Sequence, residues 1–232
     1  MDDSWIDALT PELREATSTR WEERVRSELE VGLALSDLAE RLADKGASGD
    51  VVLMARESAA QERHHAAMCQ ELAERYGERT TTLPDLSAWT PVSFGREDPE
   101  TELLFAVAGQ TCVSETIATG WLRACLREIR SPTARAAYAL HLKEELGHAR
   151  VGWAYLASTQ LSVTARDALR RSLKSMVDVN VAAWAQEANF LPGAALPAHG
   201  FLCRERSIAA IQHTLDAVIY PGFAHHGITP AR

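Results

Sequence analysis

Residues 141–150, HLKEELGHAR, place three ionisable side chains on one side of a segment that is otherwise well supplied with alanine and leucine. An ideal α-helix advances about 100° per residue, so His141, Glu145 and His148 fall within an arc of roughly 60°. The same stripe contains Tyr138 and small residues, which is typical of a face that packs against other helices. Ionisable groups on a buried face are costly unless something compensates them, and a bound cation is the simplest compensation. The stretch therefore predicts a buried helix face that binds metal.

A second Glu-x-x-His pair lies in another long helical segment. The sequence contains two such pairs, Glu62 with His65 and Glu145 with His148. In both segments the Glu and the His interrupt a stripe of apolar and small residues. One pair alone arises easily by chance, but two pairs in the middle of long helices indicate a shared site.

Two further helical segments each carry a single acid on their inner stripe, Glu28 in one and Glu115 in the other. Glu28 precedes Glu62 by 34 residues, and Glu115 precedes Glu145 by 30 residues. The order Glu, Glu-x-x-His, Glu, Glu-x-x-His is thus an internal repeat of helix pairs. Carboxylates can bridge two hard cations while imidazoles complete each shell, which favours iron or manganese over zinc or calcium.

The hydrophobic pattern predicts an all-α fold, because apolar residues recur at spacings of three and four in segments rich in Ala, Leu, Glu and Arg. Residues 78–99 contain three prolines and many hydroxyl side chains, which indicates a long crossover connection rather than a tight turn. We expect a single domain over residues 1–232, with a four-helix core at about 18–158 and two additional C-terminal helices at about 164–220. The predicted helices span about 18–45, 50–76, 100–129, 131–158, 164–189 and 201–220, with a short helix opened by Thr10 and Pro11 and an irregular tail from residue 221.

Residues 18–158 resemble the ferritin-like di-iron carboxylate superfamily, in which two helices each carry one Glu and two others each carry Glu-x-x-His. His141, one turn before Glu145, completes the pattern H-x-x-x-E-x-x-H, which looks like the p-aminobenzoate N-oxygenase family. The resemblance implies a ferritin-like four-helix bundle, two iron ions (or manganese, or a mixed iron–manganese pair) and O2 as co-substrate; in that family an arylamine nitrogen is oxidised. It assigns as metal ligands Glu28, Glu62, His65, Glu115, His141, Glu145 and His148.

Four more residues are candidates for supporting these ligands from outside. Gln61 and Glu144 directly precede the Glu of each pair, where superfamily members often carry an acid that hydrogen-bonds the free ring N–H of a ligand histidine. Cys69 lies one turn after the first pair, where radical-generating reductases of the superfamily carry a tyrosine, so a tyrosyl radical is excluded there. Cys112, on the inner stripe one turn before the lone acid of its helix, is the fourth candidate.

Other interpretations of the same residues stay open. The seven-residue set can be a bundle with buried Glu–His hydrogen bonds and no metal, although four buried acids on facing helices would repel one another. His141 can be a core histidine or a substrate-pocket residue, and Glu144 can be a partly exposed acid on the helix flank. Cys69 and Cys112 can be ordinary small core residues. His64 is expected to point about 100° away from the inner stripe.

Composition and charge limit the classes of partner that the chain is expected to bind. A net charge of −8, with glutamates interleaved among the arginines, argues against a nucleic-acid partner. No stretch approaches the roughly 20 apolar residues of a membrane span, and the N-terminus is acidic, so we expect a cytoplasmic protein without membrane association. The four cysteines form no C-x-x-C pair and are expected to be reduced thiols.

The function expected from these features is that of a non-haem di-iron oxygenase that activates O2 to oxidise a small organic substrate, by amine N-oxygenation or hydroxylation. An external electron donor is required, because the sequence contains neither a dinucleotide-binding glycine motif nor a cysteine set for an iron–sulfur cluster. An oxygenase of this kind is expected to be a monomer or homodimer. The alternative is a ferroxidase or iron-storage protein of the ferritin-like type, and a binding module that has lost its activity is a third hypothesis.

Overall fold

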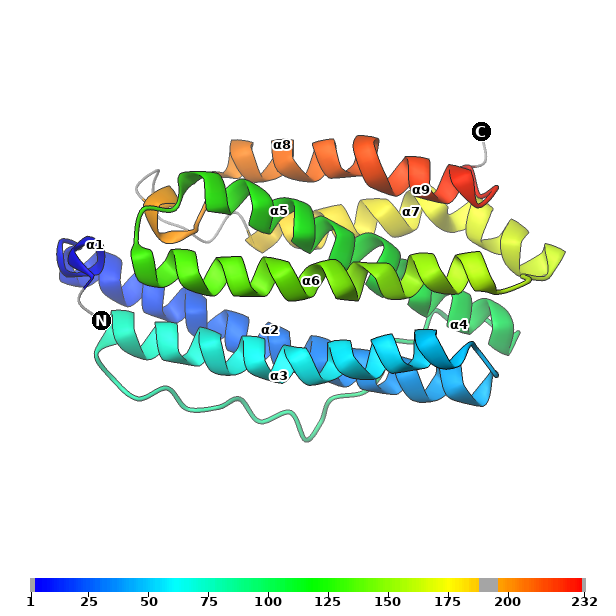
Figure 1. The fold of residues 1–232 in the computed structure, drawn as a ribbon, viewed down its shortest axis with the longest axis horizontal. Coiled ribbons are helices and arrows are strands. Elements are labelled where there is room, and N and C mark those ends of the chain that lie inside the picture. Colours follow the sequence, from blue (N-terminus) through cyan, green and yellow to red (C-terminus); the bar gives the residue numbers. More distant parts are fainter. Residues whose placement is uncertain (1–2, 188–195, 231–232) are drawn as a thin grey trace.

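The computed structural model describes residues 3–187 and 196–230, and every regular element in these ranges is helical, as predicted (Figure 1). Four long helices lie side by side, and two more helical segments cover one side of them (Figure 1). The four are α2 (Pro11–Asp44), α3 (Gly49–Gly77), α5 (Glu115–Glu128) and α6 (Pro132–Ser158). The covering segments are α7 (Val163–Glu187) and α8 (Arg204–Thr214). No helix in the described residues combines the length and apolar character that crossing a membrane requires.

The first helix pair begins earlier than predicted. The Thr10 side chain accepts a hydrogen bond from the backbone N–H of Leu13, and Pro11 occupies the first helical turn, so α2 starts at Pro11 and continues without a break through Ser18. The expectation of a separate short helix at Thr10 was wrong, since nothing between these positions interrupts the helix. A short helix does precede it, α1 (Ser4–Asp7).

The connection from α3 to the second helix pair runs along the length of the molecule (Figure 1). It comprises residues 78–98 and leads to α4 (Pro99–Val107), which begins at the opposite end from the last turn of α3. Within the second pair, α5 and α6 are joined by a short turn and are antiparallel, as are α2 and α3. The crossover lets both pairs bring their inner faces together, and α3 packs against α6.

The helix predicted over 100–129 is interrupted. Between α4 and α5 the backbone forms a π-helix, η1 (Ala108–Ser114), which ends directly before Glu115. The Thr111 hydroxyl donates to the carbonyl oxygen of Val107 at 2.7 Å and competes with the ordinary helical N–H for this acceptor. Wider π turns of this kind occur often at functional sites.

The C-terminal region is more helical than predicted. The helix expected from residue 201 begins at Arg204, because Phe201 and Leu202 are buried in an extended segment before it. The tail expected to be irregular continues through a π-helix, η3 (Leu215–Ile219), and α9 (Tyr220–His225). Its proline, Pro221, lies directly after the π-helix η3, and the helical backbone continues across it. The end of the helix predicted over 164–189 lies outside the described residues.

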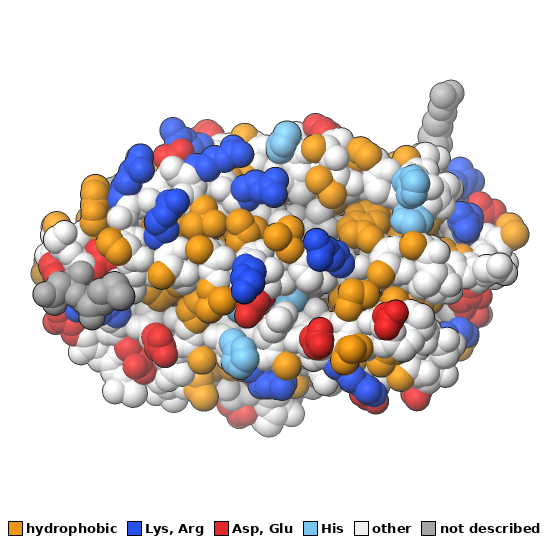
Figure 2. Space-filling view, in the orientation of Figure 1, with side chains coloured by type: hydrophobic (Ala, Val, Ile, Leu, Met, Phe, Trp, Pro, Cys, Tyr) orange, Lys and Arg blue, Asp and Glu red, His pale blue; other side chains and the backbone are white. Residues whose placement is uncertain are grey.

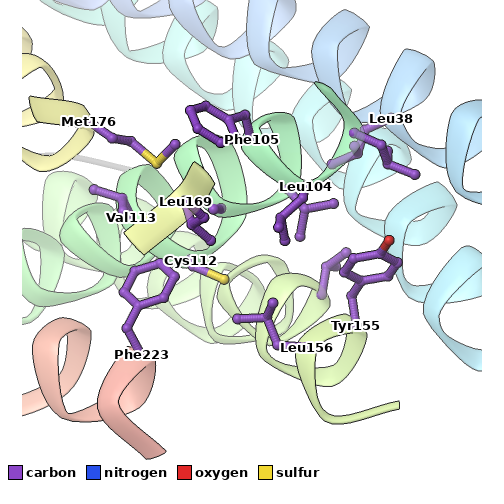
Figure 3. Close-up of a cluster of buried hydrophobic side chains, with 14 of the residues drawn as sticks. Leu38, Leu104, Phe105, Cys112, Val113, Tyr155, Leu156, Leu169, Met176 and Phe223 are labelled. Atoms are coloured by element: carbon purple, nitrogen blue, oxygen red, sulfur yellow. The ribbon is translucent and has the colours of Figure 1, made fainter. Parts of the chain in front are cut away.

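Two apolar clusters fill the interior. The larger, part of which is shown in Figure 3, contains Phe105, Cys112 and Leu169. The smaller surrounds Trp21 and Tyr138. Along α2, α3 and α6 the Glu and His positions singled out by the sequence fall between members of the two clusters. The candidate site is therefore flanked at both ends by apolar side chains that exclude water.

Candidate metal centre

All four long helices contribute to one buried group of acids and histidines. Helix α2 supplies one acid, α5 supplies one acid, α3 supplies a Glu-x-x-His pair, and α6 supplies a pair plus one more histidine. Their exposed fractions do not exceed 8%. The residues that the structure brings together are Glu28, Glu62, His65, Glu115, His141, Glu145 and His148, which is the full set of ligands implied by the resemblance.

The seven side chains form two overlapping donor groups. One atom from each member of a group lies within 4.8 Å of the others. The first donor group comprises Glu28, Glu62, His65, His141 and Glu145, and the second comprises Glu62, Glu115, Glu145 and His148. Glu62 and Glu145 belong to both groups, so their two carboxylates lie where they could bridge a pair of cations.

The two histidines of the Glu-x-x-His pairs point the same ring nitrogen inward. Nδ1 of His65 lies 2.9 Å from Oε2 of Glu62, and Nδ1 of His148 lies 2.9 Å from Oε1 of Glu62. Nδ1 of His148 also lies 3.3 Å from Oε2 of Glu145. Both rings thus aim one nitrogen at the shared carboxylates.

The outer nitrogens of these histidines are held across the helix pair. Nε2 of His65 lies 2.9 Å from the Glu144 carboxylate, and Nε2 of His148 lies 2.9 Å from Oε1 of Gln61. Glu144 and Gln61 were expected to hydrogen-bond a donor histidine, and the structure shows both bonds. Since a carboxylate and an amide oxygen are acceptors, Nε2 of each ring carries a proton, and Nδ1 is the nitrogen that would bind a cation.

His141 has a different environment. Its Nε2 lies 2.9 Å from Oε1 of Glu145 and 3.7 Å from Oε2 of Glu28, whereas its Nδ1 lies 3.4 Å from Nη2 of Arg24. A guanidinium can only donate, so Nδ1 accepts and the proton of a neutral ring sits on Nε2, directed at Glu145. His141 is part of the first donor group, but in this arrangement it donates a hydrogen bond rather than a lone pair. Both interpretations from the sequence, ligand and pocket residue, are compatible with this position.

Burial and mutual proximity shift the acid–base equilibria of the group. Burial raises the pKa of Glu28 and of Glu115, and neighbouring carboxylates add to the shift. Burial alone would also raise the pKa of Glu145, but the hydrogen bond from His141 and the nearby ring of His148 hold it well below its usual value. Glu28 and Glu115 therefore bind protons more readily than exposed carboxylates do.

The inner histidines hold protons for a related reason. Burial opposes their charged form, yet a hydrogen bond that His65 donates to Glu62 raises the pKa of His65, and the nearby carboxylates of Glu145 and Glu62 raise the pKa of His148 to about 11. These protons occupy the lone pairs that a metal ion would use. In the protein without metal, protons do the charge compensation that cations would otherwise provide.

Several polar atoms at the centre lack hydrogen-bond geometry despite close approach. Among the described residues, Oε1 of Glu62, Oε2 of Glu145 and Nδ1 of His148 are buried without a hydrogen-bond partner. Buried polar atoms without a partner are rare, and an ion that the structure does not contain is one explanation for them. The centre combines four carboxylates with two inward imidazole nitrogens, and the three atoms without a partner belong to this set. Such a donor set fits a pair of hard or borderline cations.

Two residues near the centre were not predicted. Arg24, four residues before Glu28, lies 3.3 Å from its Oε1 and stacks against Trp21, Trp121 and Tyr138. The i, i+4 spacing of this pair was a signal available in the sequence. Gln110 is the second of these residues, and helical spacing gave no signal for it.

Nε2 of Gln110 donates to Oε1 of Glu115 at 2.5 Å, across five residues. An α-helix places residues five apart on different faces, and the π-helix η1 brings them together. No pattern of α-helical spacing would have indicated this contact.

Cys69, Cys112 and His64, the other residues singled out in the sequence, have different surroundings. Cys69 is buried, and the charges of Arg24, Glu28 and Glu62 act on its thiol, whose pKa burial raises. Cys112 instead lies in the larger apolar cluster near Val113 and Leu169 (Figure 3), and it belongs to neither of the donor groups found in the described part of the chain. His64 is exposed, as expected from its angle on the helix.

A small cavity of about 160 Å³ opens beside the donor groups. Its wall includes four donor-group acids and His141 on one side and Arg24 on another. Trp121 of α5 and Trp184 of α7, whose ring centroids are 6.0 Å apart, form an apolar part of the wall. The cavity therefore provides space for a small molecule directly at the carboxylates.

Metal binding should release protons and strengthen with pH. Glu28, Glu115, His65 and His148 all have raised pKa values without metal, so the metal-free state holds more protons than the metal-bound state. We expect the apparent affinity for Mn²⁺ to rise by about tenfold or more from about pH 6 to about pH 8. Calorimetry in buffers of different ionisation enthalpy would count the released protons. His64→Ala, a matched surface variant, should leave the count unchanged, and a pH-independent affinity would contradict the protonation pattern.

Comparison with known proteins adds no relative: no protein-family model, no curated protein and no solved structure matches this chain.

Proposed function

We propose that the chain is a ferritin-like carboxylate protein with a two-metal centre, and that it is a non-haem di-iron oxygenase acting on a small organic substrate. The observation that carries the proposal is the overlap of two buried donor groups through two shared carboxylates, Glu62 and Glu145. The donor chemistry, carboxylates with imidazole nitrogens, suits iron or manganese. When bound, an iron pair would supply the redox chemistry with O2.

The side chains of the chain have the roles of holding, orienting and shielding. His65 and His148 are fixed in orientation by Glu144 and Gln61, which reduces the cost of binding a cation in one geometry. The apolar clusters at both ends keep bulk water from the centre. His141 donates a hydrogen bond from Nε2 to the Glu145 oxygen at 2.9 Å and so holds this carboxylate in place at the edge of the cavity.

The size of the cavity supports a small substrate. A volume near 150 Å³ is enough for a benzene-sized molecule, and the cavity of about 160 Å³ borders the donors directly. Trp184 from the covering helix α7 closes part of it, so the helices after residue 158 contribute to a substrate site as well as to the core. Amine N-oxygenation or hydroxylation are the reactions that the resemblance implies for such a substrate.

The alternative is a ferroxidase or iron-storage protein with the same type of site. A storage protein needs an ion path and assembly into a large shell, whereas the Trp-walled cavity favours binding of an organic molecule. Size-exclusion chromatography separates the two: an oxygenase should elute as a monomer or homodimer, and a large shell would favour storage.

The decisive test is metal analysis followed by reaction with O2. Protein purified from iron-supplemented medium should contain two iron ions per chain, and the anaerobically reduced form should consume O2 with a transient visible absorption band. A protein that binds no metal after such expression would contradict the proposal and leave a metal-free bundle with buried Glu–His hydrogen bonds.

A further inference from the structure

A second, larger hollow lies on the other side of α5 and α6 from the cavity at the donors. It has a volume of about 560 Å³ and lies between α5, α6 and α8. Its floor is apolar and includes Leu146 and Val218, which are 39% and 46% exposed. We refer to it as the α5/α6/α8 groove; its apolar lining residues are Leu146, Trp153, Leu202 and Val218, and its basic ones are Arg123, Arg127, Arg150 and Arg206.

The rim of the groove carries a concentrated positive charge. Arg123, Arg127 and Arg150 are exposed, and none of them has an ion-pair partner within residues 3–187 and 196–230. Arg206 pairs with Glu128, the one acid among the groove residues. Figure 2 shows Lys and Arg side chains gathered over α5 and α8, with hydrophobic side chains between them. This face carries a positive charge although the net charge of the chain is −8.

The floor of the groove is linked directly to the donor helices. The Thr119 hydroxyl, which lines the groove, donates to the backbone carbonyl of Glu115 at 3.0 Å, and it lies 3.4 Å from the carbonyl of Glu145. The indole N–H of Trp153 donates to the hydroxyl of Thr116, the residue after Glu115. The thickness of one helix layer, about 10 Å, therefore separates a molecule seated in the groove from the metal-binding side chains.

We propose that the α5/α6/α8 groove is the docking surface for an acidic electron-transfer protein that reduces the centre. This inference rests on the proposed function, since an oxygenase without a dinucleotide or iron–sulfur motif takes its electrons from outside. The partner delivers two electrons in single steps; each step oxidises the partner by one electron and reduces one ferric ion to ferrous, and no bond forms or breaks. An apolar centre with a charged rim is the usual anatomy of such an interface.

The charge arrangement identifies the partner as acidic. Unpaired guanidinium groups on α5 and α6 would attract carboxylates around an exposed redox centre and speed the encounter, an effect that salt screens. A small anion could pair with one arginine, but it would leave the others on the two helices without a counterpart. The proposal therefore commits to a protein partner.

Binding is the first test and needs no metal. The metal-free chain of residues 1–232 is titrated with a small acidic [2Fe–2S] ferredoxin at low salt, and with a basic c-type cytochrome as the opposite-charge probe. We expect salt-sensitive association with the ferredoxin and none with the cytochrome. Arg123→Glu with Arg150→Glu should weaken ferredoxin binding by at least about tenfold, whereas Lys45→Glu with Arg171→Glu, which changes the net charge equally on other surfaces, should not.

Electron transfer is the second test. With iron bound, the groove variant should be reduced by the acidic ferredoxin at least about tenfold more slowly than wild type, and at the same rate as wild type by dithionite. Circular dichroism checks that each variant is folded. The assignment would be overturned if wild type did not bind the ferredoxin, if salt did not displace the ferredoxin, or if the groove variant were reduced at the wild-type rate. It would also be overturned if the chain bound decanoate, a small apolar anion, and did not bind the ferredoxin. Failure of the proposed function has a different signature, because then dithionite-reduced wild type would not consume O2 although ferredoxin binding persists.

Discussion

Replacing Glu62 by alanine is expected to abolish stable metal binding at both donor groups. Glu62 belongs to each group, and its two oxygens each lie 2.9 Å from an inward histidine nitrogen. Removal of outer-shell partners alone costs 10-fold to 100-fold in metal affinity, so loss of a shared ligand should cost at least about 100-fold at each site. Metal analysis after gel filtration and calorimetric titration with Mn²⁺ would measure the loss.

Two variants make this result specific. Glu57→Ala removes an exposed acid from the same helix and should retain both ions. Glu115→Ala removes a member of the second donor group alone and should leave one ion bound at the first. Wild-type loading in Glu62→Ala or Glu145→Ala would show that the shared carboxylates are not ligands.

Replacing Gly152 by alanine should lower the free energy of unfolding by about 1–3 kcal/mol. Gly152 of α6 lies against the π-helix η1, and a Cβ there would come within 2.3 Å of the Thr111 hydroxyl, 2.5 Å of the Cys112 sulfur and 3.1 Å of the Cys112 backbone nitrogen. The backbone nitrogen cannot move aside as the tip of a side chain can. Helix α6 would have to shift away from the segment that leads into Glu115. Urea denaturation of the metal-free protein measures the effect.

Gly147 provides the matched control on the same helix. No atom lies within 4 Å of the position that its Cβ would occupy. Gly147→Ala should therefore raise stability by about 0.5–1 kcal/mol, because alanine is the better helix former. The two substitutions are chemically identical, so equal effects would show that close packing against η1 does not limit position 152.

The helices and the seven donor residues could be predicted because both follow from local periodicity. Apolar stripes at spacings of three and four place Glu62 and His65 on one inner face of α3, and they do the same for Glu145 and His148 on α6. The contacts of Gln61 and Glu144 were expected from the resemblance to the superfamily, whose members often carry an acid directly before the Glu of such a pair.

The parts that could not be predicted depend on backbone departures from the α-helix. The π-helix before Glu115 and the one before α9 leave no mark on an apolar period of three and four. The contact between Gln110 and Glu115 follows from the first of them. Thr10 and Pro11 did indicate a helix start, but the sequence did not show that this helix continues unbroken through Ser18, and the helical segment that ends at His225 was not predicted.

By itself, the sequence determined that the chain is all-helical and that one Glu or one Glu-x-x-His pair faces inward from each of four long segments. The tertiary structure decided which carboxylates are shared, which nitrogen of each histidine faces them, and that Arg24 meets His141 across 117 positions of sequence. Helical spacing sets the face on which a side chain lies, because it fixes the angle around the axis. The axial offset and distance between helices come from packing of the two apolar clusters, and these decide which atoms meet.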